Sequence, residues 1–127
     1  MKIITHYNDI KKYTTKDKST IRELMHPSHN DNSNQSIAEA VVTINNKTLL
    51  HKHLQTEEIY HITQGKGLMT LDTKIFEVAQ GDTICILPDT AHCIKNIGDS
   101  ALHFLCLCAP AYDHDDTIIL ENANLIV

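Results

Sequence analysis

Three histidines and one glutamate are spaced so that they could bind a metal ion together. One residue separates His51 from His53, Glu58 follows shortly after, and His92 lies further along the chain. Successive side chains of a β-strand point to opposite faces, so His51 and His53 would share one face of a strand. Imidazole and carboxylate groups suit a divalent transition metal. The predicted metal ligands are His51, His53, Glu58 and His92.

Glu57 is the alternative to Glu58 as the carboxylate ligand. On a strand the side chain of Glu57 would point away from the face that carries Glu58. The number of residues between Glu58 and Gly65 also fits the wider pattern around these residues. Glu58 is therefore the preferred ligand.

The wider pattern resembles a known protein family. It consists of two motifs, His51-x-His53-x4-Glu58-x6-Gly65 and Gly81-x10-His92-x3-Asn96. In both motifs the chain resembles the cupins, and in particular small bacterial single-domain cupins with a type-2 cupin barrel. The resemblance implies that the four ligands hold a metal inside a jelly-roll barrel.

Three positions depart from the cupin motifs. Asn45 stands where the first motif begins with glycine, and Leu87 and Asp89 stand where the second has proline and glycine, with Pro88 between them. Asparagine and aspartate adopt a positive φ more readily than other residues with a side chain. We therefore expect the turns at Asn45 and Asp89 to be kept.

Short segments with alternating or continuous apolar residues, separated by turn residues, indicate an all-β sandwich or barrel. The predicted strands are 19–25, 36–44, 48–53, 58–64, 68–71, 75–78, 83–87, 91–96 and 101–108. The segment 118–126 could be either strand or helix. With the cupin resemblance, the predicted fold is a double-stranded β-helix, the jelly-roll or cupin barrel.

The chain is predicted to form one domain with three parts. Residues 1–18 form an extended N-terminal arm with a short strand at Ile3–Ile4, residues 19–112 the cupin barrel, and residues 113–127 a C-terminal tail. The tail carries His114 among aspartates. It could be a solvated acidic tail, a second metal site, or a lid over the mouth of the barrel.

Charge and composition limit the partners of the protein. The formal net charge is −5 at pH 7, and no basic run extends beyond Lys11-Lys12, so nucleic acid and anionic membrane are not expected partners. No apolar segment is long enough to indicate a membrane span or a signal peptide. A cytoplasmic location is therefore expected.

Four cysteines occur without a C-x-x-C pair, and we expect reduced thiols. They could serve as small core residues. Alternatively, Cys106 and Cys108, which are two residues apart and share one face of a strand, could line the interior of the barrel. His103 would then lie on the opposite face.

Other polar residues have two interpretations each. Tyr60 shares a strand face with Glu58, so it could be a catalytic acid or hydrogen-bond donor near the metal, or a packed barrel residue. His61 is expected on the outer face. Asn96 is expected to stabilise a turn. Arg22 could bind an anionic substrate group, although a surface ion pair with a glutamate is the preferred interpretation.

The ligand set suits Fe, Mn, Ni, Zn or Cu and does not choose among them. Iron(II) with O₂ would support dioxygenase chemistry, and a non-redox metal would support an isomerase, epimerase or lyase. The expected substrate is a small oxygen-rich metabolite such as a sugar derivative or an organic acid. The alternative function is a non-catalytic module that binds or senses such a molecule. The cupin resemblance also implies a homodimer.

Overall fold

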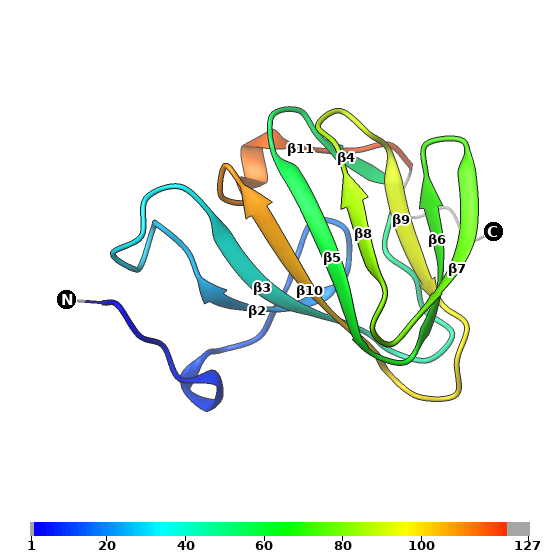
Figure 1. Ribbon diagram of the computed structural model, residues 1–127, viewed down its shortest axis with the longest axis horizontal. Helices are drawn as coiled ribbons and strands as arrows, with labels where there is room; N and C mark the ends of the chain where they lie inside the picture. The colour runs from blue at the N-terminus through cyan, green and yellow to red at the C-terminus, as the bar shows by residue number, and fades with distance from the viewer. Residues whose placement is uncertain (1, 122–127) are drawn as a thin grey trace.

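Two antiparallel β-sheets lie face to face in the computed structural model, which describes residues 2–121 (Figure 1). The six-stranded sheet has the order β1 (Tyr13–Thr14), β2 (Thr20–Met25), β3 (Ser36–Val42), β10 (Leu102–Ala109), β5 (Glu57–Gln64) and β8 (Thr83–Ile86). The five-stranded sheet has the order β11 (Thr117–Ile119), β4 (His51–His53), β9 (His92–Asn96), β6 (Lys66–Leu71) and β7 (Lys74–Ala79). Two short 3-10 turns, η1 (Tyr7–Asp9) and η2 (His114–Asp116), lie before β1 and before β11. The structure confirms the predicted all-β cupin fold, and its strand bounds differ from the predicted ones mostly by one or two residues.

Alternating burial along the central strands explains the predicted pattern. On β5 the side chains of Glu58, Tyr60 and Ile62 are buried, whereas Glu57 and Ile59 are exposed. Inward residues of both sheets meet between them, including Met69 and Ile94 from the five-stranded sheet and Leu102 and Phe104 from the six-stranded sheet. Burial of this apolar surface is the main force that holds the sheets together.

The turns at the departures from the cupin motifs are kept. Asn45 has a φ of 66° and Asp89 a φ of 63°, both in the left-handed region. The side chains of asparagine and aspartate tolerate this conformation at little cost, which is why they can replace glycine here.

The N-terminal segment differs from the prediction. Ile3 and Ile4 do not form a strand, and both side chains are exposed. The strand of this segment is β1 instead, which pairs with β2 at the edge of the six-stranded sheet. A strand forms only where a sheet edge is free to pair with it. Residues 13–14 already pair with β2 at this edge, so the apolar pair Ile3–Ile4 does not form the predicted strand.

The predicted tail also joins the barrel in part. β11 pairs with β4, and the carboxylate of Asp116 accepts hydrogen bonds from the backbone N–H groups of Gln55 and Thr56. Residues 117–119 of the predicted tail are therefore a strand of the five-stranded sheet, whereas residues 113–115 before it are exposed to solvent. The prediction for 118–126 falls partly on residues 122–127, which lie outside the described part. No helix within residues 2–121 has the length and apolar character to cross a membrane.

Candidate metal centre

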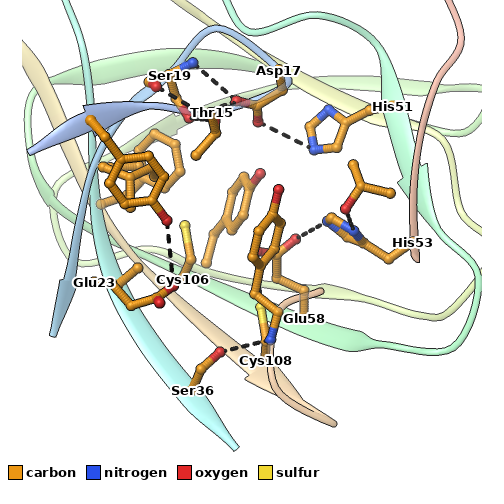
Figure 2. A pocket seen from close by; sticks show the side chains of 18 residues that line it. Thr15, Asp17, Ser19, Glu23, Ser36, His51, His53, Glu58, Cys106 and Cys108 are labelled. Carbon is orange, nitrogen blue, oxygen red and sulfur yellow. Dashed lines mark hydrogen bonds and ion pairs between the residues drawn. The ribbon is translucent and has the colours of Figure 1, made fainter. Parts of the chain in front are cut away.

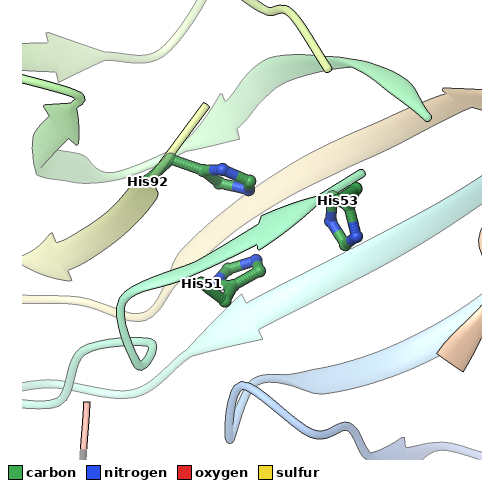
Figure 3. Close-up of side chains that lie close together, drawn as sticks. All are labelled: His51, His53 and His92. Carbon is green, nitrogen blue, oxygen red and sulfur yellow. The ribbon is translucent and has the colours of Figure 1, made fainter. Parts of the chain in front are cut away.

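Three histidine side chains converge inside the barrel (Figure 3). His51 and His53 lie on β4, and His51 is the pairing partner of His92, the first residue of β9. The ring centroids of His51 and His92 are 4.2 Å apart, and that of His53 lies 5.3 Å from His51 and 5.5 Å from His92. All three are buried, and one ring nitrogen from each lies within 4.8 Å of the others. The arrangement suggests a metal site.

The second ring nitrogen of His51 and of His92 donates to a backbone carbonyl. His51 Nδ1 lies 2.6 Å from the carbonyl oxygen of Leu49, and His92 Nδ1 lies 2.9 Å from that of Thr90. A carbonyl oxygen can only accept, so each Nδ1 carries the hydrogen. In the neutral ring Nε2 then presents its lone pair to the cluster, as metal-binding histidines do.

His53 is oriented by a threonine hydroxyl. Its Nδ1 lies 2.9 Å from Thr117 Oγ1, and this hydroxyl donates its hydrogen to the carbonyl oxygen of Asp113 at 3.0 Å. Because the hydroxyl hydrogen is already used, Thr117 accepts the hydrogen bond from His53. In the neutral ring, His53 Nε2 then also presents its lone pair to the cluster.

Glu58 reaches the histidines from the opposite sheet. Its Oε1 lies 3.2 Å from His53 Nε2 and 3.3 Å from His92 Nε2, and its Oε2 accepts from the thiol of Cys108 at 3.4 Å. Burial by itself would raise the pKa of Glu58, but the contacts with His53 and His92 outweigh it and lower the pKa below its usual range. The carboxylate is therefore charged at neutral pH. Glu57 is exposed on the outer face, as expected.

Two polar atoms of this cluster lack a partner. Among residues 2–121, Glu58 Oε1 and His92 Nε2 are buried and make no hydrogen bond. Burial, followed by the neighbouring His92, lowers the pKa of His51 to about 4, so the His51 ring is neutral at pH 7. Buried polar atoms without partners are rare and costly. The donor set and its orphaned atoms fit a divalent transition metal, although binding by these four residues stays a prediction.

A cavity of about 40 Å³ opens beside the cluster, between the two sheets (Figure 2). Each buried water needs about 10–15 Å³ by this measure, so the cavity has room for a few waters or a small ligand. Its lining includes hydroxyl, thiol and carboxylate groups, and no lysine or arginine of the described chain is among them.

Tyr60 lines this cavity next to the centre. Its ring centroid lies 4.6 Å from that of Phe104 and 5.9 Å from that of His92. Burial, with the nearby Glu58 carboxylate, raises the pKa of the Tyr60 phenol well above its usual value. Tyr60 is thus both a packed barrel residue and a protonated donor beside the site, and its catalytic role stays a prediction.

Cys106 and Cys108 are buried and line the cavity, so the alternative that they face the barrel interior is confirmed. Burial, and then the charge of Glu58, raises the pKa of both thiols. Cys85 is exposed and Cys93 half-buried, and all four cysteines are free. The two interior thiols therefore stay protonated and offer weak hydrogen-bond donors rather than nucleophiles.

The remaining candidates lie away from the cavity, as their structural interpretations predicted. Arg22 lies 4.0 Å from Glu39 in an ion pair and stacks on Tyr7. His61 Nδ1 contacts the hydroxyl of Thr83 on the outer face. Asn96 accepts from the backbone N–H of Gly98 and donates to Val42 and Ser100, which stabilises the turn after β9. His114 is exposed in the turn before β11 and is not part of the histidine cluster.

Sequence reasoning missed two residues at the centre. Thr117, in the predicted tail, orients His53, and Asp17, in the predicted arm, places its Oδ2 3.3 Å from His51 Nε2. Asp17 lies among lysines, serines and threonines between β1 and β2, where the composition indicates only a polar loop. No local signal could have revealed either contact.

The chain matches known proteins over most of its length. Residues 40–108 match the family model described as a cupin domain. The uncharacterized protein MJ1618 of Methanocaldococcus jannaschii is 57% identical over 122 residues, which cover 95% of this chain and 98% of that protein. This relative is archaeal, so a likeness to bacterial single-domain cupins in particular is not supported.

Solved structures share the fold. An oxalate decarboxylase of Lactobacillus farciminis, in complex with formate, is 25% identical with a TM-score of 0.75, over 91% of this chain and 35% of that one. The chain thus spans about a third of the length of that enzyme. The polyketide cyclase RemF of Streptomyces resistomycificus is 19% identical with a TM-score of 0.77, over 98% of this chain and 89% of that one.

Proposed function

This chain belongs to the cupin family, and on that premise we propose that it is a metal-dependent enzyme acting on a small oxygen-rich molecule. The proposed metal ligands are His51, His53, Glu58 and His92. The likeness to an oxalate decarboxylase, at 25% identity, supports a small oxygen-rich substrate. The activity of that longer protein is not carried over.

One observation carries the proposal. Glu58 Oε1 lies 3.2 Å from His53 Nε2 and 3.3 Å from His92 Nε2, and both Glu58 Oε1 and His92 Nε2 are buried without a hydrogen-bond partner. When both imidazoles are neutral, these three atoms are all acceptors, and they repel one another unless a cation lies among them. A divalent metal removes this cost, and it would supply a Lewis acid that polarises a bound oxygen.

The residues around the centre have separate tasks in this proposal. Leu49, Thr90 and Thr117 fix the orientation of the three imidazoles. Tyr60 offers a proton or a hydrogen bond from inside the cavity. The small volume of the cavity limits the number of waters that can compete with the substrate.

The test begins with elemental analysis of untagged protein purified without chelator or added metal. About one equivalent of one transition metal is expected. The metal-loaded protein is then incubated with a panel of small sugars, hydroxy acids and keto compounds, in air and under argon, and turnover is followed by NMR.

The outcomes separate the reaction classes. Turnover that needs O₂ and bound iron would assign a dioxygenase, and turnover under argon an isomerase, epimerase or lyase. Binding of metal and ligand without turnover would replace the enzyme with a binding or sensing module. Absence of metal, even after anaerobic reconstitution, would overturn the proposal.

A further inference from the structure

Asp17 is held rigidly on the turn between β1 and β2, at the edge of the cavity (Figure 2). Its Oδ1 accepts three hydrogen bonds, from the backbone N–H of Ser19 at 3.0 Å, the Ser19 hydroxyl at 2.6 Å and the Thr15 hydroxyl at 2.5 Å. These donors occupy one carboxylate oxygen and fix the plane of the group. The other oxygen, Oδ2, is left to face the histidines.

Oδ2 of Asp17 faces the ring nitrogen of His51 that points into the cluster. It lies 3.3 Å from His51 Nε2, and His51 Nδ1 already donates to the Leu49 carbonyl. In the neutral ring Nε2 therefore carries a lone pair, and two acceptors face each other. Glu58 meets His53 and His92 in the same way, at 3.2 and 3.3 Å.

These separations match those of donor atoms that share one metal. With metal–ligand bonds of about 2.1 Å, neighbouring donors at right angles lie about 3 Å apart. The contact between Asp17 and His51 has this length, and so do the contacts of Glu58. Asp17 thus makes one contact of this length with the centre, to His51, and Glu58 makes two, to His53 and His92.

The charged residues that line the cavity also favour a cation close to Asp17. No described lysine or arginine lines it, so the metal is the cation available to offset the two carboxylates of Asp17 and Glu58. Two single negative charges equal the charge of one divalent ion. A third carboxylate, Glu23, lies across the cavity from His51 and His53 and contacts Tyr13 at 3.5 Å (Figure 2).

We propose that Asp17 is a fifth protein ligand of the metal. A six-coordinate metal then has one open position instead of two, and the centre has no net charge. The site would take an uncharged molecule through a single oxygen, such as an alcohol or a carbonyl, rather than a chelating dicarboxylate. This inference rests on the proposed metal centre and narrows its substrate class.

The experiment counts the waters on bound Mn(II), by pulsed EPR in D₂O. The wild-type protein is expected to hold one water. Asp17→Asn should hold two, because the three donors to Oδ1 keep the amide oxygen on their side and turn the amide NH₂ toward the metal. Glu23→Gln, which also removes a cavity carboxylate, should hold one.

Metal affinity and anion binding give two further readouts. In competition with a chelator, Asp17→Asn should bind Mn(II) about ten- to a hundredfold more weakly, and Glu23→Gln as tightly as the wild type. At saturating Mn(II), Asp17→Asn should bind formate roughly tenfold more tightly than the wild type, because it has lost a nearby negative charge and gained an open position.

The number of waters on Mn(II) in the wild-type protein tests the role of Asp17 by itself, even if a variant does not fold. Two waters on wild-type Mn(II), or the same count and affinity in the wild type and Asp17→Asn, would overturn the role of Asp17 and leave the four-ligand centre in place. A wild-type protein that binds no Mn(II) and no other transition metal would overturn the proposed centre as well.

Discussion

Each histidine of the centre is positioned by the group that its Nδ1 contacts. For His51 and His92 this group is a backbone carbonyl two residues before the histidine in the chain, so the chain itself sets the ring orientation. For His53 it is the side chain of Thr117, 64 residues away. A single substitution at Thr117 can therefore alter the orientation of the His53 ring.

Thr117→Val keeps the shape of the buried side chain and removes the acceptor for His53 Nδ1. We expect metal affinity to fall about ten- to a hundredfold, since partners that orient metal ligands have effects of this size. Chelator competition measures the change. Thr83→Val, which removes the hydroxyl that contacts His61 outside the cavity, is the control and should have no effect. Equal affinity in Thr117→Val and the wild type would contradict the orienting role.

His53→Ala and Glu58→Ala are each expected to abolish stoichiometric metal binding without unfolding the barrel. The core around Ile62 and Leu102 does not depend on either side chain, and Glu58 has an unpartnered oxygen that alanine removes. Elemental analysis measures the loss of metal, and circular dichroism shows whether the barrel stays folded. Glu57→Ala, on the exposed face, should keep its metal. Metal loss in Glu57→Ala but not in Glu58→Ala would show that Glu57, and not Glu58, is the metal ligand.

At the level of elements, the short strand β4 is held between β11 and β9, so its position depends on residues far along the chain. Turns with a positive φ lead the chain from one sheet to the other. Gly65 between β5 and β6 has a φ of 92°, and Gly81 between β7 and β8 has a φ of 95°. The two glycines have the same backbone conformation but different surroundings.

Gly65→Ala should destabilise the protein more than Gly81→Ala. At Gly65 a Cβ would lie 3.0 Å from the carbonyl oxygen of Ala101 and 3.1 Å from the Cα of Leu102, whereas at Gly81 it would meet nothing within 4 Å. Gly81→Ala is expected to cost about 1–2 kcal/mol from backbone strain alone. Gly65→Ala should cost roughly 1–3 kcal/mol more from crowding. Urea denaturation measures both, and equal losses would show that the crowding relaxes freely.

At the level of the whole molecule, the centre joins the two sheets. All three histidines come from the five-stranded sheet, through β4 and β9, and Glu58 comes from β5 of the six-stranded sheet. Asp17 approaches from the turn at the edge of the six-stranded sheet. A bound metal would therefore connect the sheets that the apolar core already holds together.

Removal of the metal should lower the melting temperature. A ligand at a hundred times its dissociation constant adds about 2.7 kcal/mol to the free energy of unfolding, which for a chain of this size corresponds to roughly 10 °C. Calorimetry of the protein with and without chelator measures the shift. Glu58→Ala, which lacks the link between the sheets, should melt at the same temperature in both conditions. An unchanged melting temperature of metal-free wild-type protein would contradict the structural role.

The homodimer that the cupin resemblance implies stays a prediction. Ile3 and Ile4 are exposed in the single chain. Sedimentation at several protein concentrations would show whether the chain associates.

The sequence by itself determined the features that depend on neighbours in the chain. Alternation places Glu58, Tyr60 and Ile62 on one face of β5, because the strand period is two residues. The left-handed tendency of asparagine and aspartate kept the turns at Asn45 and Asp89. The four residues of the predicted centre could be selected from the two motifs for the same local reason.

Only the tertiary structure decided which distant segments complete the centre. Asp17 and Thr117 contact His51 and His53 from opposite ends of the chain, and the apolar pair Ile3–Ile4 stays outside the sheets although it resembles a strand. Such contacts depend on which sheet edges remain open and on the closure of long loops. The entropy lost on closing these loops is offset by interactions of the whole fold, so the residues next to Asp17 and Thr117 in the sequence do not indicate these contacts.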